Sequence, residues 1–192
     1  IKYRDLNGDG VIDDYDKMPI GFCDIPEITY GFGGAIEWKG FDVSIFFQGT
    51  ARVSLFEEGS TIVPFSSGYK NNDGFLRGVM ENRWTVDNPD PNARYPRTIR
   101  PSDALDNNNT KKSSFWVRNA AFLRLKNAEI GYTFPKRWME KMAIQNLRLY
   151  VSGVNLLTWA PDVHLFDPDL GSGDGRKYPP TRVFNVGLNI NF

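Results

Sequence analysis

The segment 183–192 reads VFNVGLNINF and alternates strictly between two kinds of residue. One row is apolar and the other is small or polar, as expected of a β-strand whose two faces meet different surroundings. Three asparagines and a glycine cannot fill a dry core, but they can face water inside a wide barrel. A soluble β-sandwich would also leave one face polar, so this strand alone keeps both architectures open. The apolar row is Phe184, Val186, Leu188, Ile190 and Phe192.

An earlier pair of segments shows the same alternation and predicts a hairpin. Residues 28–38 and 41–50 each carry an apolar row. Lys39-Gly40 between them suits a two-residue turn, because glycine readily takes positive φ. Such a turn pairs Trp38 with Phe41, and paired residues share a face. Both apolar rows therefore fall on the same side of the predicted hairpin.

Two further strands are predicted over 122–134 and 147–155, which makes five antiparallel strands with 182–192. The alternation changes phase within 122–134 and predicts a β-bulge near Lys126-Asn127. No long helix is expected, only short helical turns over 76–84 and 138–142. The chain is thus predicted to be all-β.

The connections between the predicted strands alternate in length. Residues 39–40 and 135–146 form short connections, whereas 51–121 and 156–181 form long ones. A compact soluble domain rarely holds a connection of roughly 70 residues with little regular structure. Outer-membrane barrels combine short periplasmic turns with long extracellular loops. In that topology the C-terminus is periplasmic, and both long connections and the residues before Ile28 are extracellular.

Composition excludes some classes of protein and leaves others open. The chain has 192 residues, and its 23 basic and 23 acidic side chains give a net charge of zero. A nucleic-acid-binding module would show a basic excess. No run approaches the roughly 20 apolar residues of a membrane-spanning helix. A membrane β-barrel is not excluded by this, because its strands alternate between apolar and polar residues. One cysteine, Cys23, excludes an internal disulfide. The first residue is Ile1, which favours a processed product or a fragment.

The N-terminal segment 5–16, DLNGDGVIDDYD, fits a calcium-binding loop. Ca²⁺ takes six to eight hard oxygen ligands, and such a loop supplies them from alternate residues around a glycine turn, here Gly10. Asp16 replaces the glutamate of an EF-hand, which resembles dockerin-type loops. We expect a structural ion that staples an extracellular loop over residues 1–24, with the barrel strands in 25–192. The predicted ligands are Asp5, Asn7, Asp9, Asp13 and Asp16 through side chains and Val11 through its carbonyl.

No residue constellation predicts catalysis, so the chain is not expected to be an enzyme. His164 is the single histidine. Glu57 and Glu58 could belong to a glycosidase pair, but sequence spacing does not give the separation of two carboxylates in space. Four loop aromatics could stack on a ligand or meet a lid, although packing or an interfacial aromatic girdle is the favoured interpretation. They are Trp84, Tyr95, Trp116 and Trp159.

Taken together, several segments resemble the C-terminal part of the SusC/RagA-type TonB-dependent outer-membrane transporters. Each segment is modest alone, and their shared order makes the resemblance specific across the whole chain. The segments are IKYRDLNGDGVID at 1–13, PEITYGF at 26–32, NRWT at 82–85, ARYP at 93–96, FLRLKN at 122–127, GYTFP at 131–135, VSGVNLLT at 151–158, FDPD at 166–169, YPPTR at 178–182 and the terminal strand.

This resemblance implies a transmembrane barrel of about 22 strands around an N-terminal plug. It implies a SusD-like lipoprotein lid, energy from TonB through an N-terminal part absent here, and glycan or oligopeptide cargo. The apolar row of 184–192, ending in Phe192, is similar to the signal that the outer-membrane assembly machinery recognises. Five strands cannot close a barrel, and lipid does not tolerate open sheet edges. The chain therefore needs the remainder of a barrel.

The alternative is a secreted, calcium-stapled β-sandwich that binds carbohydrate through exposed aromatics. The two architectures differ in what covers the apolar rows. In a barrel these side chains point outward into lipid, whereas in a sandwich they are buried between two sheets. The test residues are Ile36, Val43, Ile45, Leu188 and Ile190.

Overall fold

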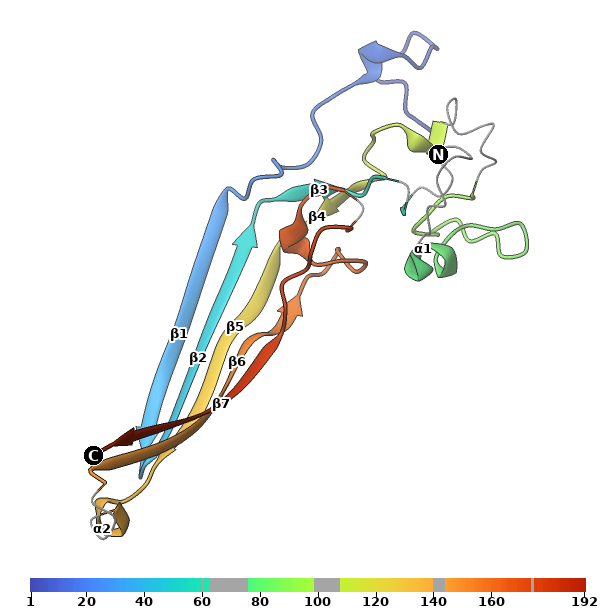
Figure 1. Cartoon of the computed structure of the whole chain (residues 1–192). Coiled ribbons are helices and arrows are strands. Elements are labelled where there is room, and N and C mark those ends of the chain that lie inside the picture. The colour runs from blue at the N-terminus through green and yellow to red at the C-terminus, as the bar shows by residue number, and fades with distance from the viewer. Residues whose placement is uncertain (60, 63–75, 99–107, 140–143, 174) are drawn as a thin grey trace.

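The computed structural model describes residues 1–59, 61–62, 76–98, 108–139, 144–173 and 175–192. The chain forms one long twisted sheet that carries loops and a small second sheet at one end (Figure 1). In chain order the strands and α-helices are β1 (Ile28–Trp38), β2 (Phe41–Ala51), β3 (Ser54–Phe56), α1 (Arg77–Glu81), β4 (Val117–Asn119), β5 (Phe122–Thr133), α2 (Lys136–Met139), β6 (Asn146–Trp159) and β7 (Val183–Asn191).

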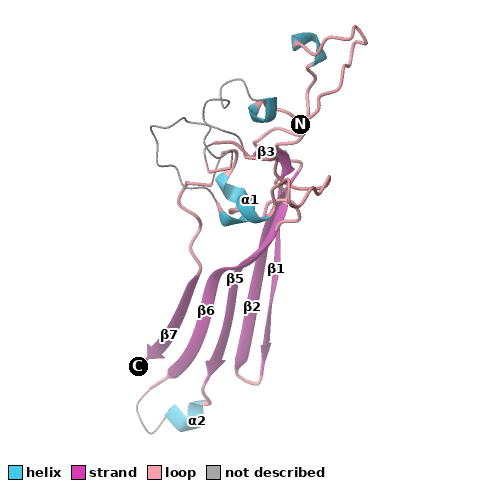
Figure 2. Cartoon of the chain, turned by 90° about the vertical axis from the view of Figure 1, so that its right-hand side faces the viewer, coloured by secondary structure: helices cyan, strands magenta, loops and turns pink. Residues whose placement is uncertain are grey.

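The large sheet has the order β1-β2-β5-β6-β7, and every neighbouring pair is antiparallel. Trp38 pairs with Phe41, which confirms the predicted hairpin register. Both turn residues have positive φ, 49° at Lys39 and 90° at Gly40. Two positive φ values define the turn that matches the natural twist of a β-hairpin. This turn and the connection after β5 lie at the same end of the sheet as the C-terminus (Figure 2).

The predicted bulge in β5 is confirmed. Phe46 pairs with Asn127 and Phe47 pairs with Leu125, so Lys126 is the extra residue. The bulge explains the phase change in the sequence, because it returns Leu125 to the face that Ile130 occupies. The apolar row of β5 is therefore continuous despite the break in alternation.

Two details differ from the sequence expectation. Strand β6 continues to Trp159, four residues beyond the predicted end at 155, and Asn155 within it has a φ of 54°. The 51–121 connection is not free of sheet structure, because β3 and β4 pair there. The helical turn predicted at 76–84 is present as α1. Helix α2 includes the first two residues of the turn predicted at 138–142. Residues 140–142 lie outside the described residues.

The hydrophobic core lies among the loops and not against the large sheet. One cluster contains Val53, Leu55, Ala120 and Val163, and the other contains Ile62, Val79, Tyr95 and Trp116. Both clusters lie at the end of the sheet opposite the hairpin turns, which we call the loop end (Figure 1). None of the helices within the described ranges has the length and apolar character needed to cross a membrane.

Candidate functional site: the two sheet faces and the loop end

One face of the large sheet is apolar and uncovered. Ile36 is 69% exposed and Leu188 is 54% exposed, and Ile45 and Ile190 are exposed as well, whereas Val43 is half-buried by its neighbours. In the part of the chain that the structure describes, no second sheet lies over this face, so the sandwich arrangement is not what forms. One row crosses all five strands through Ile36, Val43, Ile130, Val151 and Val186.

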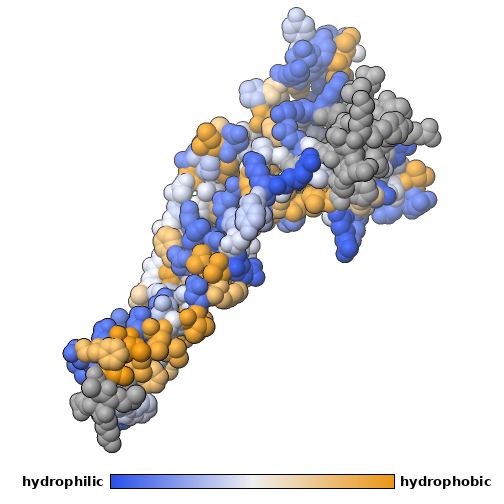
Figure 3. Space-filling model, in the orientation of Figure 1, coloured by the Kyte–Doolittle hydropathy of each residue, from blue (hydrophilic) through white to orange (hydrophobic). Residues whose placement is uncertain are grey.

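Aromatic side chains mark both ends of this apolar face. Near the hairpin turns, the ring centroids of Phe41 and Tyr132 are 4.6 Å apart. Toward the loop end, Phe47 stacks on Phe32 at 5.2 Å and lies 6.4 Å from Trp159. The apolar band between the two aromatic groups is broad, and orange surface gathers over the lower sheet in Figure 3.

The height of this band can be estimated along β1. Trp38 belongs to the lower aromatic group and Tyr30 to the upper one, eight positions away on the same face. Eight residues of extended strand span about 26 Å. The apolar band of an outer-membrane barrel, flanked by aromatic girdles, is about 25 Å tall. Measured along the strand, the spacing of the aromatic groups is close to that height, and a strand tilt of about 35–45° would reduce it to about 18–21 Å across the membrane.

The opposite face of the sheet is polar and carries a three-strand ion network. Arg148 on β6 donates from Nε to Asp42 Oδ1 on β2 at 3.0 Å, and its Nη2 contacts Glu129 Oε1 on β5 at 2.6 Å. The guanidinium also lies 5.0 Å from the centre of the Tyr150 ring. It passes over Gly131, where a Cβ atom would approach Asp42 Oδ1 to 2.6 Å. Glycine at 131 thus leaves the space through which Arg148 reaches two strands.

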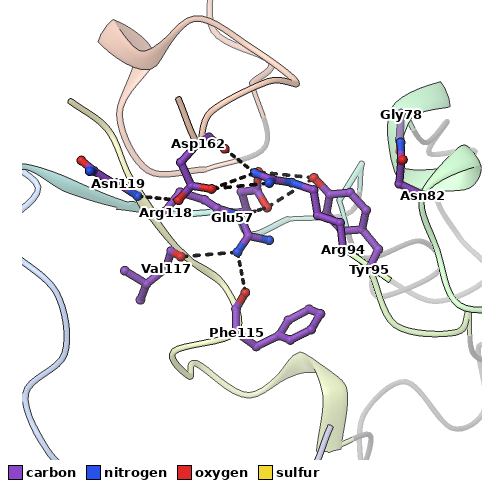
Figure 4. Close-up of polar contacts among 10 residues, drawn as sticks. All are labelled: Glu57, Gly78, Asn82, Arg94, Tyr95, Phe115, Val117, Arg118, Asn119 and Asp162. Atoms are coloured by element: carbon purple, nitrogen blue, oxygen red, sulfur yellow. Dashed lines mark hydrogen bonds and ion pairs between the residues drawn. The ribbon is translucent and has the colours of Figure 1, made fainter. Parts of the chain in front are cut away.

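A second ion network lies buried at the loop end, around Glu57 (Figure 4). The Glu57 side chain is fully buried and accepts a hydrogen bond from Arg118 Nε at 2.8 Å. Arg94 lies 3.7 Å from the same carboxylate, and the Tyr95 hydroxyl donates to it at 3.3 Å. Burial raises the pKa of the Tyr95 hydroxyl, and the Glu57 carboxylate raises this pKa further. With its carboxylate committed to these groups, Glu57 does not offer the free acid or base of a glycosidase.

A third network attaches the segment 162–173 to the polar face of β5. The Arg124 side chain is 1% exposed and forms ion pairs with Asp167 at 2.5 Å and Asp169 at 2.8 Å. Burial raises the pKa of the Asp169 carboxyl. The Gly173 N–H donates to the Phe56 carbonyl at 2.9 Å and continues the attachment to β3. We call 162–173 the strap, because it joins β5 to the small sheet.

The predicted calcium loop is closed by its own carboxylates. Asp5 accepts bonds from the N–H groups of Gly8 and Gly10, at 2.6 and 2.8 Å, and both glycines have φ near 80°. Asp16 accepts from Leu6 and Asp13, at 2.7 and 2.9 Å. The bonds from Asp13 and Leu6 hold the pKa of the Asp16 carboxyl below its usual value.

The donor chemistry of this loop suits a hard cation, because oxygen atoms from alternate residues surround a glycine turn. The side chains, however, are turned toward backbone amides. Across the described ranges, no three His, Cys, Asp or Glu side chains are gathered as a metal site. Ion binding would therefore require these carboxylates to converge from their present positions.

The four predicted ligand aromatics do not share one site. Tyr95 and Trp116 are 1% and 3% exposed and pack in the loop core, with ring centroids 6.4 Å apart. Trp84 is half-buried nearby. Trp159 is 50% exposed on the apolar face of β6. The geometry thus gives Tyr95 and Trp116 a packing role and puts Trp159 in the upper aromatic group.

The predicted assembly-signal residues all lie on the apolar face of β7 or just after it. They are 40–79% exposed, from Ile190 to Phe192. In the described part of the chain, β7 has a hydrogen-bonded neighbour on one side only, and so has β1. The terminal strand therefore offers both a free edge and an apolar row.

Sequence reasoning missed the three arginine networks. Arg148 and Glu129 could have been paired, because both fall on the polar rows of predicted neighbouring strands. No local signal links Glu57 to Arg118, which is 61 residues away. The sequence around Arg124 does not predict its ion pairs either, because Asp167 and Asp169 lie in the long connection after β6.

Comparison with known proteins identifies the group to which the chain is similar. It is 30% identical, over its whole length, to TonB-dependent receptor P26 of Formosa agariphila, and it covers 19% of that protein. It is 26% identical over 99% of its length to TonB-dependent receptor SusC of Bacteroides thetaiotaomicron, of which it covers 17%. No protein-family model matches the chain.

The solved structures agree on the fold. The RagAB peptide importer in its closed-closed state superposes with a TM-score of 0.71 at 22% identity, covering 95% of this chain and 19% of that one. Another RagAB peptide transporter structure gives a TM-score of 0.66 at 23% identity, with the same coverage.

The chain is similar over its whole length to TonB-dependent receptors, SusC among them, and its fold matches part of the RagAB transporter structures. It spans about one fifth of the length of the curated relatives. The relatives are receptors and transporters, in agreement with the expectation that the chain is not an enzyme.

Proposed function

We propose that this chain forms the C-terminal wall segment of an outer-membrane barrel of about 22 strands that imports nutrients. The observation that carries the proposal is a five-stranded sheet that, among the described residues, has an uncovered apolar face, a polar face and two unpaired edges. Lipid requires every backbone group to be paired within the protein, so both edges must continue into further strands. The remaining part of the receptor supplies these strands.

The proposed orientation puts the hairpin end in the periplasm and the loop end outside the cell. Short turns at one end and long loops at the other are the usual arrangement of outer-membrane barrels. Residues 1–24 and the connections 51–121 and 156–181 would then be extracellular, and Phe192 would be periplasmic. The polar face, with Arg148 and Glu129, would line the interior and meet the plug.

The proposed transport cycle needs partners that the chain itself does not contain. TonB would supply energy through the N-terminal part of the receptor, and a SusD-like lipoprotein would close the extracellular mouth. The cargo class is a glycan or an oligopeptide, and nucleic acid is not a proposed partner. The support is the similarity to SusC and to the fold of the RagAB transporter.

Uptake by cells that express the full-length receptor tests this function. Fluorescent oligosaccharide and oligopeptide mixtures are offered to cells with and without a functional TonB. We expect one mixture to accumulate in the periplasm only when both receptor and TonB are present. Accumulation of neither mixture, or equal accumulation without the receptor, would contradict an import function.

We also propose that the loop 5–16 binds a structural Ca²⁺ ion. Asp5, Asn7, Asp9, Asp13 and Asp16 would hold it through side-chain oxygens and Val11 through its carbonyl. The ion would fix the loop and neutralise part of its negative charge. The support is the order of oxygen donors around a glycine turn.

Titration of Ca²⁺ into chelator-treated full-length receptor tests the ion site. We expect binding heat and a higher melting temperature for the wild type, because the ion binds only the folded loop. The double variant D5N/D9N should lose both effects, since it removes two anionic ligands. The matched control D87N changes an exposed aspartate outside the loop and should behave as wild type. Absence of heat in the wild type, or full heat in D5N/D9N, would refute the site.

A further inference from the structure

Three basic side chains lie at the hairpin end of the sheet, beside the lower aromatic group. Lys39 occupies the β1–β2 turn, and Lys136 and Arg137 begin α2 in the connection after β5. The two connections are adjacent in space, because the Thr133 N–H donates to the Gly40 carbonyl at 2.7 Å. Figure 2 shows the hairpin turn and α2 together at the end of the sheet opposite the loops. We call Lys39, Lys136 and Arg137 the basic rim.

The charges of the basic rim are not neutralised within the described part of the chain. All three side chains are exposed, and none of them forms an ion pair with a described carboxylate. The two acidic residues that flank the hairpin turn, Glu37 and Asp42, lie on the polar face of the sheet, and Asp42 is paired with Arg148. The basic rim is therefore a local excess of positive charge in a chain of zero net charge.

Aromatic rings place this charge at the boundary of the apolar face. Lys39 Nζ lies 4.7 Å from the centre of the Trp38 ring, and Trp38 is 66% exposed on the apolar face. Trp138, which directly follows Arg137, is 53% exposed, and its ring centroid lies 6.3 Å from that of Phe134. Tryptophan rings are enriched at the headgroup level of membranes. The basic rim thus lies where the apolar face ends and water begins.

The chemistry of this boundary defines the molecule that fits it. Cations without counter-charges attract anionic phosphate groups, and the adjoining apolar face accepts acyl chains. A soluble anion would use only the charges. A zwitterionic lipid brings its own cation to the headgroup, so it gains less from the basic rim. An anionic phospholipid uses both parts of the surface.

We propose that the basic rim binds the headgroups of anionic phospholipids in the membrane leaflet around the hairpin end. The inference rests on the barrel wall proposed above and adds a preference for one class of lipid. In the proposed orientation this leaflet is the periplasmic one. The apolar band alone does not select among phospholipids, because it contacts their acyl chains, so the preference comes from the basic rim.

The test uses full-length receptor folded into vesicles of phosphatidylcholine mixed with phosphatidylglycerol. Native mass spectrometry of the released receptor compares how much of each lipid it retains. The variant K39Q/K136Q/R137Q removes the three charges and leaves every aromatic ring in place. The variant K39R/K136R/R137K keeps the charges and reports whether the substitutions themselves disturb the wall.

A matched control changes the same number of charges at the other end of the sheet. The control K2Q/R97Q/K111Q neutralises three exposed basic side chains in the loops. The yield of inserted receptor is measured for every variant. Each variant is also compared at low and high salt, because salt screens attraction between exposed charges.

We expect wild type to retain phosphatidylglycerol in preference to phosphatidylcholine. In K39Q/K136Q/R137Q this preference should fall about tenfold or more, because each basic side chain near a membrane adds to the attraction of anionic lipid. The charge-preserving variant and the loop control should retain the wild-type preference. High salt should weaken the preference of wild type far more than that of K39Q/K136Q/R137Q.

Other outcomes would overturn the proposal. A receptor that inserts without any lipid preference, or a preference that survives in K39Q/K136Q/R137Q, would refute the basic rim and leave the barrel wall intact. An equal loss in the loop control would also refute it. Loss of a copurifying protein, with lipid preference unchanged, would assign the three cations to a protein partner instead. Failure of wild type to insert into the vesicles would contradict the barrel wall itself.

Discussion

At the scale of single residues, Arg124 shows how the loop end is held to the sheet. Its side chain is almost completely buried, and a buried charge is tolerated only when it is paired and hydrogen-bonded. Asp167 and Asp169 provide the counter-charge, and Thr158 Oγ1 accepts a bond from Nε at 3.0 Å. All three partners follow β6 or lie at its end. One arginine thus fixes the middle of the strap to β5.

Removal of this charge should release the strap. In the full-length receptor, R124M leaves two aspartates facing an apolar side chain, and breaking a buried pair costs about 3 kcal/mol or more. Asp169 can still reach water, so the lower end of that range is expected. Hydrogen exchange over 163–173 should become much faster than in wild type.

The matched control for Arg124 is K112M. Lys112 pairs with Glu58 at 3.2 Å, but its side chain is 70% exposed. Exposed ion pairs contribute about 0–1 kcal/mol, so exchange over the strap should not change. Equal protection of the strap in R124M and wild type would show that Arg124 does not hold it.

At this scale the sequence predicted types of residue better than their partners. The apolar row of 184–192 could be assigned from alternation, because a strand has period two. The packing of Tyr95 against Trp116 could not, because it depends on how a long connection folds back on itself. The same holds for Glu57, which follows β3 directly, and Arg118, which lies in β4. Their meeting is a tertiary event without a local pattern.

At the scale of an element, β6 separates two environments along adjacent positions. Val151 lies on the apolar face and is 45% exposed, whereas Ser152 lies on the polar face opposite Glu129. In a membrane barrel the first faces lipid and the second faces water. This neighbouring pair therefore tests the orientation of the wall directly.

Arginine should destabilise the barrel far more at position 151 than at position 152. In the full-length receptor, V151R should destabilise the folded barrel by about 2–4 kcal/mol, because a charge near the bilayer midplane is costly. The control S152R puts the same side chain beside Glu129 on the polar face and should cost much less. Urea unfolding of receptor folded into lipid vesicles measures both. Equal destabilisation by the two variants would contradict the proposed lipid-facing side.

Strand existence and register were predictable from the sequence, and strand ends were less so. Lys39-Gly40 determined the β1–β2 pairing because a two-residue turn admits one register. The end of β6 was missed because Asn155 takes a left-handed φ, which interrupts alternation without ending the strand. Strands β3 and β4 have three residues each, too few for a periodic signal.

At the scale of the whole chain, the sheet and the loop end differ in what stabilises them. The loop end has two hydrophobic clusters and two buried ion networks. The large sheet has hydrogen bonds between strands but an uncovered apolar face. In the proposed barrel, burial of this apolar face by lipid and pairing with further strands would supply the missing stability. The loop end, in contrast, carries its own core.

The pairing of β2 with β5 has a consequence for the order in which the wall assembles. These neighbours are separated by the chain from Arg52 to Ala121, whereas the β1–β2 hairpin closes over two residues. Closing the long connection costs about 3 kcal/mol more in chain entropy than closing the short one. We therefore expect β1–β2 and β5–β6 to form first and to join late. Pulse-labelled hydrogen exchange during folding of the full-length receptor should protect β1–β2 amides before β2–β5 amides, and simultaneous protection would contradict this order.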